Sequence, residues 1–251
     1  MKISGNTILI TGGGSGIGRA LAESFHSRGN KVIIASRRQT ALDEVTRANP
    51  GMASLTLDIE NAGAIRNFAS RLTAQHPALN IIVHNAGIMR PEKLLAPDFD
   101  LADAEATVAT NLFGPIRLTA ALLPHLKRQP AAAIITVTSG LAFIPIASFP
   151  TYCATKAAMH SYTESLRHQL EDTPIEILEI PPPYVQTGLT GAHQVADPNA
   201  MPLNEYIAET MQLLSATPTP AEILVERVKP LRFAAKGDYA AFFKTLNAAW
   251  P

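Results

Sequence analysis

Short apolar runs alternate with amphipathic segments through the first 180 residues of the chain. The apolar runs are rich in β-branched residues, which is typical of buried strands. We expect these strands at residues 7–11, 31–35, 54–57, 80–83, 133–138 and 175–180. The segments between them repeat apolar residues three or four positions apart, as the buried face of a helix does. We expect these helices at residues 17–28, 39–48, 62–76, 102–112, 115–128 and 151–171.

This alternation predicts the class of fold. Strands separated by helices of this length pair in parallel through right-handed crossovers. Strands that are apolar on both faces are expected where helices cover both sides of a sheet. The pattern therefore predicts an α/β fold: a single, doubly wound Rossmann domain that spans residues 1–251, since no repeat or linker divides the chain.

The pattern loosens after residue 183. Residues 184–220 contain four prolines and one amphipathic stretch at 203–215, and a short helix at 237–248 is expected to end the chain. A long irregular segment beside a sheet edge is typical of a binding loop. We therefore expect residues 184–220 to form a substrate-binding loop or lid.

A glycine-rich turn follows the first predicted strand and opens the first predicted helix. Glycine adopts positive φ and has no Cβ to hold a pyrophosphate away from the backbone, and the free N–H groups of a helix start favour phosphate. A glycine string alone is weak evidence, but this strand–turn–helix context is the one that a dinucleotide site requires. The turn supplies these candidate cofactor-binding residues: Gly12, Gly14, Ser15, Gly16, Ile17 and Gly18.

The end of the second predicted strand favours one dinucleotide over the other. An NAD site needs an Asp or Glu there to accept hydrogen bonds from the ribose. This chain has Ser36, Arg37 and Arg38 instead, and guanidinium groups suit the 2′-phosphate of NADP. We expect NADP(H) to be preferred, with NAD(H) use as the alternative and a solvated helix start as the non-functional interpretation.

Three polar residues suggest acid–base chemistry. Tyr152 and Lys156 are four apart at the start of a predicted helix and so share one face, while Ser139 ends the fifth predicted strand. A lysine ammonium beside a tyrosine stabilises the phenolate and lowers its pKa, and a serine can hydrogen-bond a reacting oxygen. Each residue alone has an ordinary structural explanation; their order along the chain is what predicts interconversion of a carbonyl and an alcohol by hydride transfer.

Taken together, the motifs TGxxxGIG at 11–18, NAG at 85–87 and YxxxK at 152–156 resemble those of the short-chain dehydrogenase/reductase family. The similarity runs over about residues 5–190, and Ser139 has the family's usual spacing from Tyr152. The resemblance implies that Asn111 is the fourth catalytic residue, at a helix distortion in the proton relay. It also implies that Lys156 holds the nicotinamide ribose, and that Asp58 contacts the adenine. The further cofactor-binding positions that it implies are Ile59, Asn85, Ala86, Gly87, Tyr152, Pro182, Val185 and Thr187.

The chain departs from the family pattern in two places. Pro183 stands where the family commonly has glycine, which fixes the backbone beneath the nicotinamide. The family's glycine-rich last strand is also missing, which leaves a homodimer and a homotetramer both open. Both departures are similar to the DltE-type oxidoreductase subgroup.

Charge and cysteine content narrow the remaining classes. Lys+Arg and Asp+Glu number 21 each, which gives no basic field for nucleic acid or a membrane surface. The one cysteine and the scattered histidines predict no metal site, and the N-terminus has no signal-peptide pattern, so we expect a cytoplasmic enzyme that acts on a small molecule. A redox-sensing nucleotide-binding protein and a nucleotide-retaining isomerase or dehydratase remain the alternatives. The substrate is not predicted.

Overall fold

Six parallel strands form one sheet in the computed structural model, which describes residues 1–249. The strand order is β3-β2-β1-β4-β5-β6, so the order reverses between β1 and β4. This is the topology of a doubly wound Rossmann fold, as predicted. The strands are β1 (Thr7–Thr11), β2 (Lys31–Ser36), β3 (Ala53–Thr56), β4 (Leu79–His84), β5 (Ala132–Val137) and β6 (Ile175–Ile180).

The helices lie within a few residues of the predicted ranges, except for the two four-residue helices α7 and α9, which were not predicted. They are α1 (Gly16–His26), α2 (Gln39–Ala48), α3 (Ala62–Gln75), α4 (Ala102–Val108), α5 (Gly114–Leu126), α6 (Pro150–Gln169), α7 (Ala192–Val195), α8 (Leu203–Leu214), α9 (Lys229–Arg232) and α10 (Tyr239–Ala248). Short 3-10 turns lie at η2 (Gly140–Ala142), η3 (Glu226–Val228) and η4 (Ala234–Lys236).

One prediction about the helices is wrong. The segments 102–112 and 115–128 were expected as two helices, but α4 and α5 form one continuous helix through a π-helical turn, η1 (Ala109–Phe113). Pro115 has no N–H for the carbonyl four residues before it, which would interrupt an ordinary α-helix. The wider π turn lies at this point. Its hydrogen bonds join residues five apart instead of four, and the helix continues past the proline.

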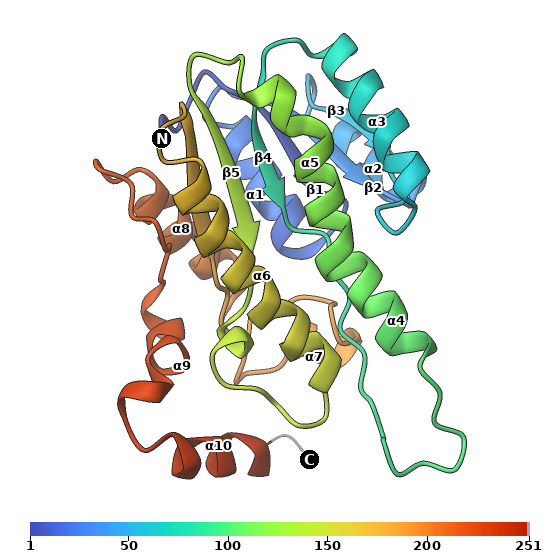
Figure 1. Cartoon of the computed structure of the whole chain (residues 1–251), viewed down its shortest axis with the longest axis vertical. Helices are drawn as coiled ribbons and strands as arrows, with labels where there is room; N and C mark the ends of the chain where they lie inside the picture. The colour runs from blue at the N-terminus through green and yellow to red at the C-terminus, as the bar shows by residue number, and fades with distance from the viewer. Residues whose placement is uncertain (250–251) are drawn as a thin grey trace.

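Helices cover both faces of the sheet. In Figure 1, α5 and α6 lie in front of the sheet and α1 lies behind it. The core behind the sheet includes buried residues of α1, α2 and α8, and the core in front includes residues of α3, α5 and α6. Alternate residues of each strand enter the two cores, for example Ile8 and Ile10 behind and Leu9 in front. This is why nearly every strand position is apolar.

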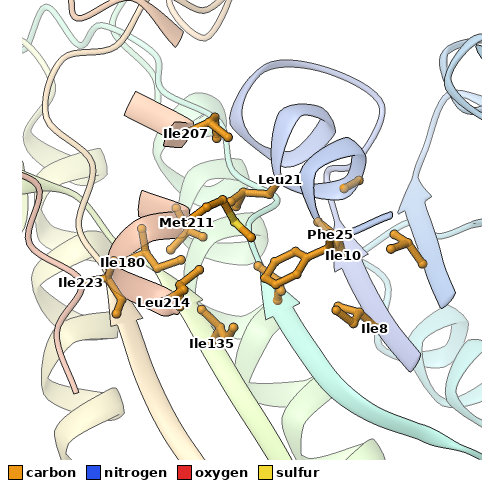
Figure 2. Packing of buried hydrophobic residues seen from close by; sticks show 14 of the residues in the cluster. Ile8, Ile10, Leu21, Phe25, Ile135, Ile180, Ile207, Met211, Leu214 and Ile223 are labelled. Atoms are coloured by element: carbon orange, nitrogen blue, oxygen red, sulfur yellow. The ribbon is translucent and has the colours of Figure 1, made fainter. Parts of the chain in front are cut away.

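Helix α8 belongs to the rear core. Tyr206, Met211 and Leu214 are at most 1% exposed and pack in the cluster that contains Leu21 and Phe25 of α1. Figure 2 shows Met211 and Leu214 between these α1 side chains and the strands. The predicted loop segment 184–220 therefore contains a core helix, and its irregular part is the chain that precedes Leu203.

The continuous helix Ala102–Leu126 is also long and apolar enough to cross a membrane by length and composition alone. Its residues Leu118, Leu122 and Leu126 are fully buried in the front core. Core helices commonly show such composition, and the packing accounts for it here.

The carboxyl ends of the strands face the lower half of Figure 1, where α7 and α10 lie. Helix α10 is attached there through Asn247, which donates to the carbonyl of Pro145 at 3.2 Å and accepts from the N–H of Ala147. Beyond β6, residues 221–223 add one parallel bridge, with hydrogen bonds between Glu179 and both Ala221 and Ile223. The sequence analysis expected the family's glycine-rich last strand to be missing. At this edge of the sheet the structure has this single bridge instead.

The packing of α8 predicts the effect of one truncation. Leu214→Ala should lower the free energy of unfolding by about 2–5 kcal/mol, because it leaves a cavity in the rear core. Urea denaturation followed by circular dichroism would measure this. Leu95→Ala is the matched control: Leu95 is 99% exposed, and its loss should change stability by less than about 0.5 kcal/mol. Equal stability of both variants would contradict the placement of α8 in the core.

Candidate active site

The glycine turn between β1 and α1 is tightly packed against the start of the chain after β4. Gly12 and Gly16 have φ of 70° and 53°, in the left-handed region. A Cβ on Gly12 would lie 2.8 Å from Nδ2 of Asn85, and one on Gly18 would lie 2.3 Å from the same atom. Glycine is therefore required at both positions by conformation or by space.

Thr11 and Asn85 hold this turn in place. The Thr11 hydroxyl accepts from the N–H groups of Asn85 and Ala86 at 3.0 and 3.1 Å. Nδ2 of Asn85 donates to the carbonyl of Thr11 at 3.0 Å. We refer to these bonds as the β1–β4 clamp. The clamp lies where the strand order reverses, which is the position at which open α/β sheets bind their ligands.

A cleft of about 600 Å³ opens over the clamp. This size falls within the range of small-molecule and cofactor sites. The first N–H groups of α1 face it without competition, since the N-cap residue Ser15 makes no side-chain cap. The predicted residues that line the cleft are Gly12, Ser15, Gly16, Ile17, Gly18, Arg38, Asn85, Ala86, Gly87, Ser139, Tyr152, Lys156, Pro182, Val185 and Thr187.

Five predicted cofactor residues do not line the cleft. Gly14 packs against Ala41 and Ser36, so both Gly14 and Ser36 support the turn from behind. Arg37 is directed to Glu60, with an ion pair of 2.9 Å. The Asp58 carboxylate accepts from the N–H of Glu60, and Ile59 is buried. Of the two arginines, only Arg38 lines the cleft.

Several cleft residues were missed by the sequence reasoning. They come mainly from the chain after β4 and from the segment after β6: Ile88, Met89, Arg90, Val137, Thr138, Gly188, Leu189 and Gln194. Gln194 is 4% exposed and donates to the carbonyl of Val185 at 2.8 Å, which closes the 185–194 loop onto itself. No local motif indicates such a contact, because it depends on the tertiary course of the loop.

Ser139, Tyr152 and Lys156 meet on one wall of the cleft. Tyr152 and Lys156 share a face of α6, and the ammonium lies 5.6 Å from the centre of the tyrosine ring. Ser139 follows β5, and its Oγ accepts from the N–H of Leu141 at 3.1 Å, which fixes the side chain. All three residues are at most 7% exposed.

Burial dominates the electrostatics of this wall. It raises the pKa of Tyr152, and a hydrogen bond with Ser139 offsets only part of that effect. Burial also lowers the pKa of Lys156 to about 8, against the charge of Glu179, which raises it. The sequence reasoning expected a lowered tyrosine pKa; in this structure the direction is opposite, because desolvation of the phenolate is the largest cause. Tyr152 is therefore a protonated phenol at neutral pH, and it holds this proton more firmly than a tyrosine in water does.

Asn111 lies in the π-helical turn, as the family resemblance implied. Its side chain accepts from the N–H of Ile88 and donates to the carbonyl of the same residue, both at 2.9 Å. It also donates to the hydroxyl of Thr155 at 3.3 Å. Asn111 does not line the cleft, so in this structure it fastens the chain after β4 to helices η1 and α6.

A smaller, mostly apolar pocket of about 100 Å³ adjoins the cleft. The two share Met89, Ser139, Tyr152, Pro182, Pro183, Leu189 and Gln194. The pocket alone is lined by Leu141, Ile146, Tyr184, Thr190, Leu231 and Leu246. The hydroxyls of Ser139 and Tyr152 thus lie at the junction of the two spaces. A molecule that reacts beside Ser139 and Tyr152 can therefore extend into both the cleft and the small pocket.

The comparisons with known proteins identify the family of the chain. The family model described as short chain dehydrogenase matches residues 6–197. The uncharacterized oxidoreductase DltE of Bacillus subtilis is 38% identical over 250 residues, which are 98% of each chain. A short chain dehydrogenase from Burkholderia cenocepacia, in complex with NADP, has a TM-score of 0.83 at 25% identity and covers 98% of this chain and 99% of its own. The fold is shared as well by a short chain dehydrogenase/reductase from Burkholderia phymatum in complex with NAD, with a TM-score of 0.79, 22% identity and 96% of each chain covered. The chain belongs to the short-chain dehydrogenase/reductase family of oxidoreductases and is of the DltE type.

Proposed function

We propose that this oxidoreductase interconverts a carbonyl and a secondary alcohol with NADP(H), and that Tyr152 is its general acid and base. The observation behind the proposal is the position of the Ser139 and Tyr152 hydroxyls, at the junction of a nucleotide-sized cleft and a small apolar pocket. A bound nicotinamide nucleotide supplies or accepts the hydride.

Ser139, Tyr152 and Lys156 each have a separate role in the proposed reaction. Ser139 donates a hydrogen bond to the substrate oxygen as negative charge develops on it. Tyr152, a phenol at neutral pH, gives its proton to that oxygen in the reductive direction. The Lys156 ammonium stabilises the phenolate that remains.

Fit of the nucleotide rests on the glycine turn and the clamp. The positive φ of Gly12 and Gly16 and the absent Cβ at Gly18 let a phosphate approach the N–H groups of α1. Gly12, Ser15 and Gly16 would hold the pyrophosphate, and Asn85, Lys156 and Thr187 would line the nicotinamide half. Arg38 would hold the 2′-phosphate that distinguishes NADP from NAD.

The small pocket suggests a class of substrate. At about 100 Å³ it is smaller than the engineered cavity of about 150 Å³ that binds benzene, so it suits a short aliphatic substituent. Arg90, at the cleft, is paired with Asp103, which leaves its charge neutralised. We therefore propose small, uncharged aliphatic ketones or aldehydes as substrates. We also propose that the whole chain is one domain, and that the protein is a cytoplasmic homodimer or homotetramer.

Removal of the phenolic hydroxyl tests the acid–base role. Tyr152→Phe should lower kcat for carbonyl reduction by about 10²–10⁴-fold, because proton donation to the substrate oxygen is lost. NADPH binding, followed by its fluorescence, should stay within a few-fold of the unaltered protein. A variant that keeps more than a tenth of the rate would refute the role. Saturable NADPH binding without turnover over a full carbonyl panel would favour the redox-sensor alternative.

The two arginines provide a matched pair for cofactor choice. Arg38→Ala should lower kcat/KM for NADPH by about 10–100-fold, since a charge-assisted bond contributes about 1.5–3 kcal/mol, and should leave the value for NADH nearly unchanged. Arg37→Ala should change neither by more than about twofold, because Arg37 is directed to Glu60. Equal NADPH effects of the two substitutions would contradict the assignment of Arg38.

The pocket wall predicts a size limit. Leu246→Phe should lower kcat/KM for the longest accepted ketone by at least about tenfold and spare the smallest, because the pocket loses several carbons of space. Steady-state rates over a series of ketones of increasing chain length would measure this. Leu95→Phe, at a 99% exposed leucine, is the control and should leave the series unchanged. A uniform loss over all ketones would place the substrate elsewhere.

A further inference from the structure

Glu179 is a buried carboxylate that the proposed reaction does not use. It is 0% exposed, in β6, with the apolar residues Leu178 and Ile180 on either side. Burial of a lone carboxylate is costly, and an apolar side chain of similar size commonly replaces a buried ion pair at little or no cost in stability. The position therefore calls for a reason other than packing.

Both carboxylate oxygens of Glu179 have a polar partner inside the protein. The Thr138 hydroxyl donates to one carboxylate oxygen at 2.6 Å, and Nδ1 of His160 lies 2.8 Å from the other. The side chain is therefore fixed in position, with its negative end directed at Thr138 and His160. The hydrogen bond to Glu179 is also the largest cause of the raised pKa of His160.

His160 lies one helical turn after Lys156 on α6. Residues four apart share a face of a helix, so Lys156 and His160 both face the end of the sheet where Glu179 lies. Thr138, the other partner of Glu179, directly follows Val137, whose carbonyl accepts from the Lys156 ammonium at 2.9 Å. Glu179 thus lies on β6 behind the wall of Tyr152 and Lys156, in contact with Thr138 at the end of β5.

The buried Lys156 ammonium needs a negative charge on the side where Glu179 lies. It is 5% exposed, and its ammonium donates to a neutral carbonyl. Burial lowers its pKa to about 8, and the charge of Glu179 is the cause that opposes the fall. The titratable neighbours on its own helix are Tyr152 and Cys153, one turn before it, and His160, one turn after it, and none of them carries a negative charge at neutral pH.

The outer side of the cluster is already balanced. Arg232 of α9 forms an ion pair with Glu222, which lies on the bridge beside Glu179. Nε2 of His160 lies 3.8 Å from Glu164, whose side chain is 56% exposed. Arg167 donates to backbone carbonyls of this region. The charge of Glu179 also contributes to the raised pKa of Arg232, so this buried carboxylate acts on Arg232 as well as on His160 and Lys156.

We propose that Glu179 is a positioning residue for Lys156, acting as the buried counter-charge that keeps the Lys156 ammonium protonated inside the dry wall of the active site. Its consequence for catalysis rests on the proposed function: without a protonated lysine, the phenolate left by proton transfer loses its stabilising charge. The titration of Lys156 itself does not depend on any substrate.

Lysine labelled with ¹³C at Cε allows that titration to be followed by NMR, with the Lys156 resonance assigned by its loss in Lys156→Arg. In Glu179→Gln the carboxylate becomes a neutral amide of the same shape. Removal of a negative charge lowers the pKa of a neighbouring ammonium, so Lys156 should lose its proton about one pH unit lower, a tenfold change in its protonation equilibrium. Titration of Lys156 at the same pH in both proteins would overturn the proposal.

Glu176→Gln is the matched control, since Glu176 lies on the same strand with a half-exposed side chain that pairs with the N-terminus. It should leave the Lys156 titration unchanged. Where Glu179→Gln does not fold, the double variant His160→Leu with Glu179→Met removes the buried pair together and leaves no uncompensated charge. It should shift Lys156 in the same direction, and no shift in this variant would equally overturn the proposal.

Kinetics separate this proposal from the proposed function. The pH at which kcat/KM for carbonyl reduction falls on the basic side should move down with the Lys156 titration in Glu179→Gln. A shifted titration in a protein that reduces no carbonyl would refute the proposed function and retain the role of Glu179. If the protein reduces carbonyls but the Lys156 titration is unchanged in Glu179→Gln, the role of Glu179 is refuted and the proposed function is retained.

Discussion

The β1–β4 clamp is the junction on which the rest of the site depends. Thr11 and Asn85 join the two central strands where the order of the sheet reverses. The glycine turn can approach this junction only because Gly12 and Gly18 have no Cβ. Helix α1 then starts above it with free N–H groups, and the carboxyl ends of β5 and β6 bring Ser139 and the 185–194 loop to the same edge. A parallel sheet makes this convergence unavoidable, because every strand ends on one side.

Desolvation gives this site its chemical character. A tyrosine and a lysine in water would be protonated over most of the physiological range and would differ little in their readiness to exchange protons. Buried on α6, the phenol holds its proton more firmly while the ammonium holds its proton less firmly. Their pKa values therefore move apart, and that of Lys156 falls to about 8, close enough to neutral pH for a nearby charge to change its protonation. Such a wall is sensitive to the charges behind it.

The fold and the meeting of Ser139, Tyr152 and Lys156 at one cleft could be predicted from the sequence because their signals are local. Strand runs, the glycine turn and the four-residue spacing of Tyr152 and Lys156 all lie within single elements. Cofactor contacts were less predictable: Arg37 and Arg38 are adjacent, yet one is directed to Glu60 and the other lines the cleft. The choice between them depends on a residue more than twenty positions away. Gln194 and Leu246 could not be predicted, because loops and a distant helix bring them to the site.

The attachment of α10 through Asn247 separates two properties that are usually linked. The last helix contributes Leu246 to the small pocket but supplies no buried residue to either main core. Its sequence is therefore free to drift without endangering the folded state, while each change alters the shape of the space beside Ser139. Members of this subgroup could diverge in the compounds that they accept through a short terminal segment, with the ancient nucleotide scaffold left untouched. Substrate selectivity in this architecture therefore depends on a peripheral segment that is easily replaced.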